Sequence, residues 1–341
     1  MTRAWRAATA ALLLSGCGEP GRGAARAAGS ASAGVATSAS VGAAASAGAV
    51  GTSEPPATPE PVAPASPEEG LLRDALVEIR PRPGPLVRRG ELDARLASDG
   101  GSTPVTLALA LSADPLAYRP ALAFYRLASG LQARVVPVTA LRHLSVGELG
   151  PLAERQPEMM TLLREARVQN DGTIDALLAA SGGAGGVPVD VEHGREVVAW
   201  GRWAASLTPA PGEDSGLLRD YLEMLALDYL SANVVRRRAV LRGGGLVLTD
   251  NASAFPPRTD GPSLDRLLRR LRAAQRFPRG LREALLAFDR ERAVAAFADG
   301  GFETWLLSPR ARLELDERRA ALLTLIEARI GERGAAAVLS L

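Results

Sequence analysis

The chain has 341 residues, one cysteine, 23% charged residues and a formal net charge of +2 at pH 7. Arg3 and Arg6 supply this excess, so the rest of the chain is electrically balanced, which argues against a nucleic-acid partner. A single cysteine excludes an intramolecular disulfide. All 40 Lys and Arg residues are arginines, so the chain contains no lysine.

The N-terminus has the layout of a secretory signal. Arg3 and Arg6 precede an apolar run over residues 7–14, which is too short to span a bilayer. The Leu-Ser-Gly-Cys sequence that ends at Cys17 resembles the cleavage and acylation motif of bacterial lipoproteins. The resemblance implies that residues 1–16 are removed and that Cys17 carries acyl chains such as palmitate. A plain secretory signal with a chance cysteine is the alternative.

The predicted anchor sets the expected location. Acylation of Cys17 makes the membrane a partner, because each buried CH2 contributes about 0.8 kcal/mol. Gly18 rather than an aspartate follows Cys17, which in such lipoproteins favours the outer membrane. We therefore expect a protein of the cell envelope, on the periplasmic face or the surface of the outer membrane, with another envelope protein as a further candidate partner.

Residues 17–68 are of low complexity, rich first in Ala, Ser and Gly and then in Pro and Glu. Such a segment buries too little apolar surface to offset its ordering entropy. The sequence therefore predicts a disordered tether between the anchor and one larger domain.

Residues 69–140 predict a strand-rich lobe. Strands are expected over 72–79 and 105–111, where apolar runs are bounded by Pro, Gly or Asp-Gly-Gly turn signals. A helix is expected over 120–131, with Pro near its start and Gly near its end.

Residues 141–341 predict a mainly helical lobe. One or two strands are expected over 189–203, and a hairpin is expected over 239–248, where three glycines separate two apolar runs. The apolar periodicity predicts helices over 146–180 (with a break at 170–172), 216–233, 264–276, 280–288, 290–299 and 310–333. The fold class is therefore α+β, with two lobes.

Two stretches together carry a family resemblance. The first is ALAFYRLASGLQARVVP over 121–137, and the second runs from LDYLSANVVRRRAVL at 227–241 through the glycine hairpin to LTDNASAF at 248–255. They resemble the atypical kinases of the secretory pathway, which include the Golgi casein-kinase and four-jointed families, with phosphoinositide-kinase-like and HipA-like proteins as relatives. The resemblance implies a two-lobed protein-kinase-like fold.

The resemblance also implies roles for individual residues. Asp228, Asn233 and Arg236 fit the catalytic loop of the family, and Asp250 fits the aspartate that binds the metal ion.

At four further positions, this sequence lacks the residue type that the family uses there. Val235 stands where the family has its catalytic aspartate, and a second metal ligand falls at about Val240. The helix glutamate falls near Ala121, and the strand over 105–111 cannot supply the phosphate-binding lysine. Valine has no lone pair for a proton or a metal ion. The pattern therefore predicts a pseudokinase, with residual binding of nucleotide or Mg²⁺ left open.

The functional hypotheses that remain open fall into three classes. The first is a non-catalytic binding or regulatory module. The second is an envelope scaffold or adaptor with no kinase relation. The third is a divergent metal-dependent phosphotransferase that uses Asp250.

Other chemistry-bearing patterns have plainer alternatives. A metal site is weighed against a solvated stretch for Asp190, Glu192, His193 and Glu196. Arg236, Arg237 and Arg238 could grip a phosphate, or Arg236 could pair internally. A lipid-facing surface is weighed against a solvated helix face for Arg266, Arg269, Arg270, Arg272, Arg276, Arg279 and Arg282. Core or lobe-interface positions, rather than a base-stacking platform, are expected for Trp200, Trp203 and Trp305.

Overall fold

The structure is a computed structural model that describes residues 67–81, 90–98, 101–154, 156–181, 186–259, 261–298 and 305–341. These residues lie in one compact unit that begins at Val62. The predicted signal, the acylation of Cys17 and nearly all of the predicted tether lie outside the described residues. Among the helices of the described ranges, none is both long enough and apolar enough to cross a membrane.

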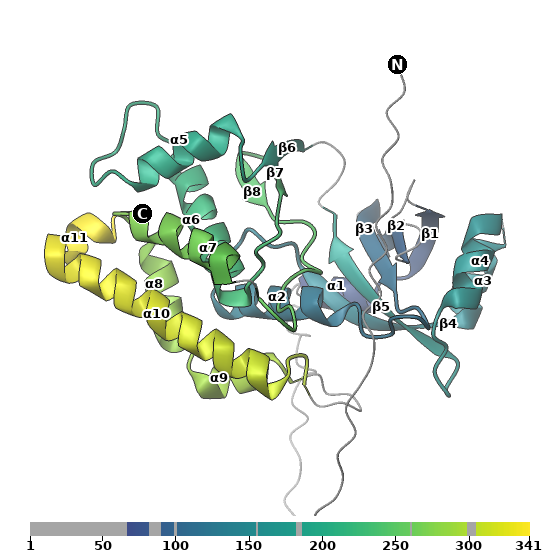
Figure 1. The fold of residues 1–341 in the computed structure, drawn as a ribbon. Helices are drawn as coiled ribbons and strands as arrows, with labels where there is room; N and C mark the ends of the chain where they lie inside the picture. Colours follow the sequence, from purple (N-terminus) through teal and green to yellow (C-terminus); the bar gives the residue numbers. More distant parts are fainter. Residues whose placement is uncertain are drawn as a thin grey trace, which may run out of the picture. The chain divides into compact units, whose positions relative to one another are not determined.

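A five-stranded antiparallel sheet forms the first lobe, with strand order β1-β2-β3-β5-β4 (Figure 1). The strands are β1 (Leu76–Pro81), β2 (Glu91–Ser98), β3 (Gly101–Leu109), β4 (Thr139–Ser145) and β5 (Thr173–Ala180). Because β5 completes the sheet, the sheet extends 40 residues beyond residue 140, where the sequence ended the strand-rich lobe.

The two faces of this sheet pack against different elements. On β3, Val105, Leu107 and Leu109 are buried in a cluster with residues of α3 (Val146–Ala153) and α4 (Pro157–Glu165). Side chains alternate across a strand, so Ala108 points to the other face. There it packs on the larger cluster, which contains most of the apolar face of α2 (Arg119–Gly130). The sheet is therefore covered on one side and supported by α2 on the other.

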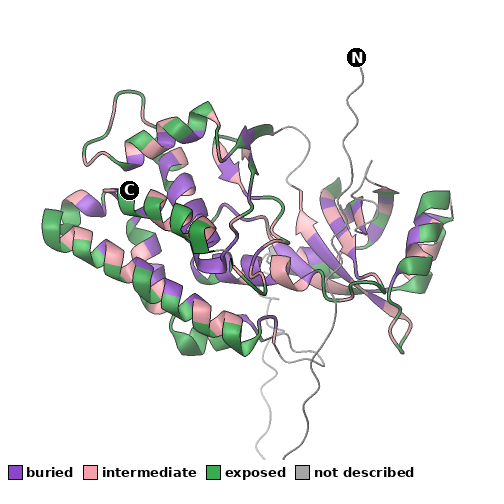
Figure 2. Ribbon diagram, in the orientation of Figure 1, coloured by how far each residue is buried: buried purple, intermediate pink, exposed green. Residues whose placement is uncertain are grey.

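The second lobe is mainly helical. Its central helix is α6 (Ser215–Ser231), in which nearly every residue from Tyr221 to Ser231 is buried (Figure 2). The strands β6 (Val187–Asp190), β7 (Arg238–Arg242) and β8 (Gly245–Val247) form a small second sheet. The remaining helices are α5 (Arg195–Ala204), α7 (Gly261–Ala273), α8 (Arg279–Ala287), α9 (Arg290–Ala296), α10 (Pro309–Arg333) and α11 (Ala335–Val338).

Several elements differ from the sequence-based prediction. A short helix, α1 (Pro67–Arg73), precedes β1, so the first strand starts at Leu76 rather than at 72. The helix predicted over 146–180 ends early, because its last apolar run pairs with both β3 and β4 and becomes β5. The strand predicted within 189–203 is mostly α5, whose buried residues Val197, Trp200 and Ala204 follow a helical spacing.

Candidate functional site

The end of α6 places the residues that the resemblance assigns to a catalytic loop. Asp214 caps the start of this helix by accepting hydrogen bonds from Gly216 N at 2.9 Å and Leu217 N at 3.1 Å. The helix ends at Ala232, whose left-handed backbone (φ 54°) reverses the chain. Asn233 N then donates to Asp228 O at 2.8 Å. This turn brings Asn233 and Asp228 together inside the lobe, where they are 1% and 3% exposed.

Arg236 fixes this turn from within. Its Nε lies 2.9 Å from both carboxylate oxygens of Asp228. Its Nη1 donates to Thr249 O at 2.6 Å, and its Nη2 donates to Asn251 Oδ1 at 2.9 Å. The guanidinium also lies 5.1 Å from the ring centroid of Phe124 in α2. Arg236 therefore pairs internally and joins α6, the segment after β8, and α2.

Burial of this pair changes the pKa of Asp228. It raises the pKa of the Asp228 carboxyl to about 6, and the adjacent guanidinium of Arg236 opposes this rise. A charge with this degree of burial needs its partner, because an uncompensated buried charge is costly. The pair holds the local structure together.

Asp250 has a different environment. It is exposed, and its left-handed backbone (φ 59°) is one that non-glycine residues rarely adopt. Nearby, Phe255 N donates to Ser231 O at 2.7 Å, and the ring of Phe255 packs edge-on against Phe297 with centroids 6.2 Å apart. The segment after β8 is thus anchored on both sides of Asp250, which itself faces solvent.

Valine residues occupy the positions of the expected base and of the expected second metal ligand. Val235 is 58% exposed beside Arg236. Val240 pairs with Pro188 and Val247 within the small sheet, and its side chain lies against Gly186, where a Cβ would approach Val240 Cγ1. An apolar side chain therefore occupies both positions.

The sheet offers no phosphate-binding cation on β3. Thr106 and Ala108 lie on the face of β3 toward α2, opposite the buried outer face. Their cross-strand neighbours on β2 are Asp93 and Glu91, and Arg95 follows opposite Pro104. In α2, Ala121 packs on the core, and the helix contains no acidic residue. Neither Thr106 nor Ala108 can supply the positive charge that a kinase lysine offers to a phosphate.

These residues do not fit the metal that a kinase holds. Within the described ranges, no three His, Cys, Asp or Glu side chains gather at one point. Asp250 is a single carboxylate, whereas Mg²⁺ and Ca²⁺ sites use several oxygen ligands. The stretch around Asp190, for which a metal site was considered, forms a turn. In this turn, Asp190 Oδ1 accepts hydrogen bonds from Glu192 N at 2.8 Å and His193 N at 3.0 Å.

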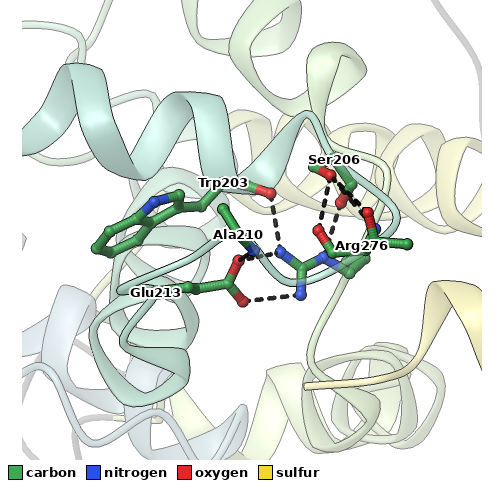
Figure 3. A network of polar contacts seen from close by, with 6 residues as sticks. Trp203, Ser206, Ala210, Glu213 and Arg276 are labelled. Atoms are coloured by element: carbon green, nitrogen blue, oxygen red, sulfur yellow. Dashed lines mark hydrogen bonds and ion pairs between the residues drawn. The ribbon is translucent and has the colours of Figure 1, made fainter.

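The arginine-rich segment over 266–282 is largely committed to the protein. Arg276 is 1% exposed and is the centre of a buried network (Figure 3). Its Nη2 lies 2.6 Å from Glu213 Oε2 and donates to Trp203 O at 2.9 Å, and its Nε donates to Ser206 O at 2.7 Å. Arg282 pairs with Glu327 at 2.7 Å. Both alternatives weighed for this segment, a lipid-facing surface and a solvated helix face, place its arginines at the surface and are therefore wrong for Arg276.

The tryptophans serve packing. Trp200 is 2% exposed and lies 5.8 Å from the ring of Tyr221, and Trp203 packs at the edge of the same cluster. Trp305 stacks under Arg312 at 4.1 Å. In the glycine hairpin, Gly243 and Gly244 have positive φ angles of 56° and 81°, which is the conformation of a tight turn.

One carboxyl group with a shifted pKa, that of Glu223, was not predicted from the sequence. Glu223 in α6 lies five residues before Asp228, and its Oε2 accepts from Arg134 N at 3.4 Å. Burial, and then the nearby Asp220 carboxylate, raise the pKa of Glu223 to about 7. Asp220 accepts from Leu246 N at 2.8 Å, so both acids hold the hairpin and the 131–135 segment against α6.

No protein-family model matches this sequence, and no curated protein does. Solved structures do match. The structure of hydra Fam20 with sugar is 13% identical with a TM-score of 0.53, over 80% of this chain and 90% of that one. The Golgi casein kinase is 13% identical with a TM-score of 0.53, over 80% and 78%. The same kinase with Mn and ADP bound is 14% identical with a TM-score of 0.52, over 80% and 77%.

Identities this low establish the fold alone. They confirm the expected α+β architecture of a strand-rich and a helical lobe, and they argue against a scaffold of unrelated fold. The chain has a kinase-like fold similar to that of Fam20 and the Golgi casein kinase.

Proposed function

We propose that this chain is a lipid-anchored protein of the cell envelope whose kinase-like domain binds a ligand or partner and does not transfer phosphate. The observation that carries the proposal is the division between retained and lost motif residues. Asp228, Arg236, Asn251 and Phe255 are retained, and each makes a contact inside the fold. Asn233 and Asp250 are retained without such a side-chain contact. Apart from Asp250, the positions that would act on substrate hold valine, alanine or threonine.

The difference between the retained and the lost motif residues has a physical explanation. Phosphoryl transfer depends on charges that position and stabilise the phosphoryl group. A chain that kept the motif for catalysis would retain those charges, whereas a chain that kept it for stability would retain the internal contacts. The second pattern supports the loss of phosphate transfer, which leaves binding as the role that we propose for the domain.

Calorimetric titration of the full chain with ATP, in the presence of Mg²⁺ or Mn²⁺, tests the binding side of the proposal. We expect no saturable heat at millimolar nucleotide, because β3 offers Thr106 and Ala108 where phosphates need a cation, with Glu91 and Asp93 opposite. Saturable, metal-dependent binding that is lost in Asp250→Ala would favour the divergent phosphotransferase, since one of the similar structures carries Mn and ADP.

Membrane anchoring has its own test. In the native host, wild-type protein is expected in the membrane fraction with the added mass of acyl chains at its N-terminal cysteine. Cys17→Ser should be found in the soluble fraction without that mass. An unacylated wild-type protein, or membrane association that survives Cys17→Ser, would contradict the anchor and leave the reading of the kinase-like domain intact.

A further inference from the structure

The outward face of the helix α7 is strongly basic. The helix carries four arginines against one aspartate, which are Arg266, Arg269, Arg270, Arg272 and Asp265. No other helix in the described ranges has so large an excess of arginine over acid. Arg266, Arg269 and Arg272 are spaced by three residues, so they lie along one face, and all three are exposed (Figure 2). The helix therefore presents a row of guanidinium groups to solvent.

Most of this charge is not neutralised within the fold. The side chains of Arg269 and Arg272 make no hydrogen bond or ion pair to any residue that the structure describes. Arg270 donates to two neutral backbone carbonyl oxygens, at 3.1 Å and 3.3 Å, and keeps its charge. Arg266 pairs with an acid, since its Nη1 lies 3.2 Å from Glu192 Oε1. Three positive charges of α7 therefore remain, against its one aspartate.

The basic surface continues across a neighbouring pocket. This pocket of about 240 Å³ lies between α7, the turn after α6 and the chain after β6. Arg266 and Arg270 line it from α7, and Arg237 lines it from the turn. Arg237 is exposed, and its side chain has no ion pair with another described residue. We call the four uncompensated cations, Arg237, Arg269, Arg270 and Arg272, the α7 patch.

The chemistry of the α7 patch favours an extended surface that carries phosphate groups. The donors of a guanidinium group match two oxygens of a phosphate. Exposed cations along an open helix face suit a flat partner, because a flat surface can meet all of them at once. A membrane with anionic phospholipids is such a surface, and each arginine near it strengthens binding about fivefold.

The predicted anchor brings the domain within reach of such a surface. Residues 18–66 lie between Cys17 and α1, and a chain of about 50 residues spans up to about 170 Å when extended. Any face of the domain can then meet the membrane, so the surface charges decide which one does. A linker also keeps the domain at a high effective concentration near the membrane, on the order of millimolar, so a weak attraction is sufficient.

We propose that the α7 patch docks the domain on the anionic phospholipid headgroups of the membrane that holds its anchor. The arginines contact the lipid phosphates, and this contact fixes the orientation of the tethered domain. The inference rests on the lipid anchor of the proposed function and adds a second, electrostatic contact to it. Docking of this strength needs the tether, so Cys17→Ser is still expected in the soluble fraction after cell fractionation.

Sedimentation with lipid vesicles tests the α7 patch without the anchor. The predicted mature chain from residue 17, carrying Cys17→Ser, is mixed at low salt with vesicles of phosphatidylglycerol and phosphatidylcholine in equal parts, or of phosphatidylcholine alone. We expect sedimentation with the anionic vesicles at millimolar lipid and none with the neutral vesicles. Salt at 1 M should release the protein, because the Debye length falls to about 3 Å. No sedimentation with the anionic vesicles overturns the proposal, also if the chain binds poly-glutamate instead.

Two double variants locate the docking surface. Arg269→Gln/Arg272→Gln removes two charges of the α7 patch and should weaken vesicle binding about twenty-five-fold, since each arginine contributes about fivefold. The matched control Arg290→Gln/Arg292→Gln removes two exposed charges from α9, whose side chains likewise have no partner in the described chain, and should retain wild-type binding. Both variants should keep the wild-type Tm. Equal loss of binding in both would indicate attraction by net charge and would contradict the α7 patch.

Chemical modification separates this inference from the proposed function. Phenylglyoxal should modify Arg269 and Arg272 of the acylated wild-type protein more slowly on anionic vesicles than in detergent, and Arg290 equally fast in both. Equal rates for all three arginines would overturn docking and leave the anchor intact. An unacylated wild-type protein would overturn the anchor alone, and the vesicle results for the Cys17→Ser chain would still decide the α7 patch.

Discussion

Arg236 and Asp228 form the residue-scale contact on which the centre of the helical lobe depends. Their side chains are 2% and 4% exposed, and the guanidinium also bonds Thr249 O and Asn251. Removing one partner of a buried pair leaves an uncompensated charge, whereas replacing both with apolar groups removes the desolvation cost as well. The stabilisation therefore belongs to the pair and not to either residue.

Arg236→Met should lower the free energy of unfolding by about 3–5 kcal/mol, because it leaves the Asp228 carboxylate buried without its partner. The double variant Asp228→Leu/Arg236→Met should recover a large part of that loss. Urea denaturation measures both, with the exposed Arg238→Met as control, expected within about 0.5 kcal/mol of wild type. A loss below about 1 kcal/mol for Arg236→Met would contradict this role.

Glu223 makes stability depend on pH. Its pKa is raised from 4.5 to about 7, so the fold favours the protonated carboxyl. This contribution is fully present below pH 4.5 and is lost as pH rises through about 7. Glu223→Gln should therefore stabilise the protein at pH 8, by on the order of 1 kcal/mol after allowance for partial exposure, and should change little at pH 4.5.

Urea midpoints across this pH range measure the effect of Glu223→Gln. The matched control is Glu158→Gln, an exposed position on α4, which should not stabilise the protein at pH 8. Equal stabilisation by Glu223→Gln at pH 4.5 and pH 8 would show that the native carboxyl is not perturbed.

At the scale of elements, α2 links the two lobes through its close packing. Its last residue, Gly130, lies against Phe288, and a Cβ there would clash with Phe288 Cε2. Phe288 in turn packs edge-on against Phe297, with centroids 6.2 Å apart, so its ring has little room to move. The glycine at the end of α2 is therefore a packing requirement as well as a helix stop.

Gly130→Ala should destabilise the protein by about 1–3 kcal/mol, because the added methyl group must displace a buried ring. Gly331→Ala in the exposed part of α10 is the matched control, since nothing lies within 4 Å of its Cβ position. That substitution should stabilise by about 0.5–1 kcal/mol through helix propensity alone. Thermal unfolding distinguishes the two, and similar shifts for both variants would contradict the packing role.

The helices and strands differ in how well a local sequence pattern predicts them. The helix α6 and the hairpin were predicted because apolar periodicity and adjacent glycines are local signals. The strand β5 was not, since its short apolar run fits a helix equally well, and only its pairing with β3 and β4 decides. The strands β2 and β4 were missed because charged or polar residues such as Asp93, Arg95 and Arg142 interrupt their apolar residues.

At the scale of the whole molecule, spacing predicted the fold better than it predicted the site. The order of the motif pieces indicated two lobes, and the structural matches confirm that fold. The internal pairing of Arg236 with Asp228 was weighed from the sequence. The pocket between the residues after β6, the turn after α6, and α7 was not predicted from the sequence, because only tertiary packing brings these three segments together.

The central claim is that this kinase-like domain does not transfer phosphate. The most direct test incubates the full chain with γ-labelled ATP, Mg²⁺ or Mn²⁺, and casein as a general acceptor, and measures label on the acceptor, on the chain and in free phosphate. We predict no signal above a heat-denatured blank, and the same result for Asp250→Ala. Label that appears with wild type, persists in the exposed control Asp316→Ala, and disappears in Asp250→Ala would contradict the claim.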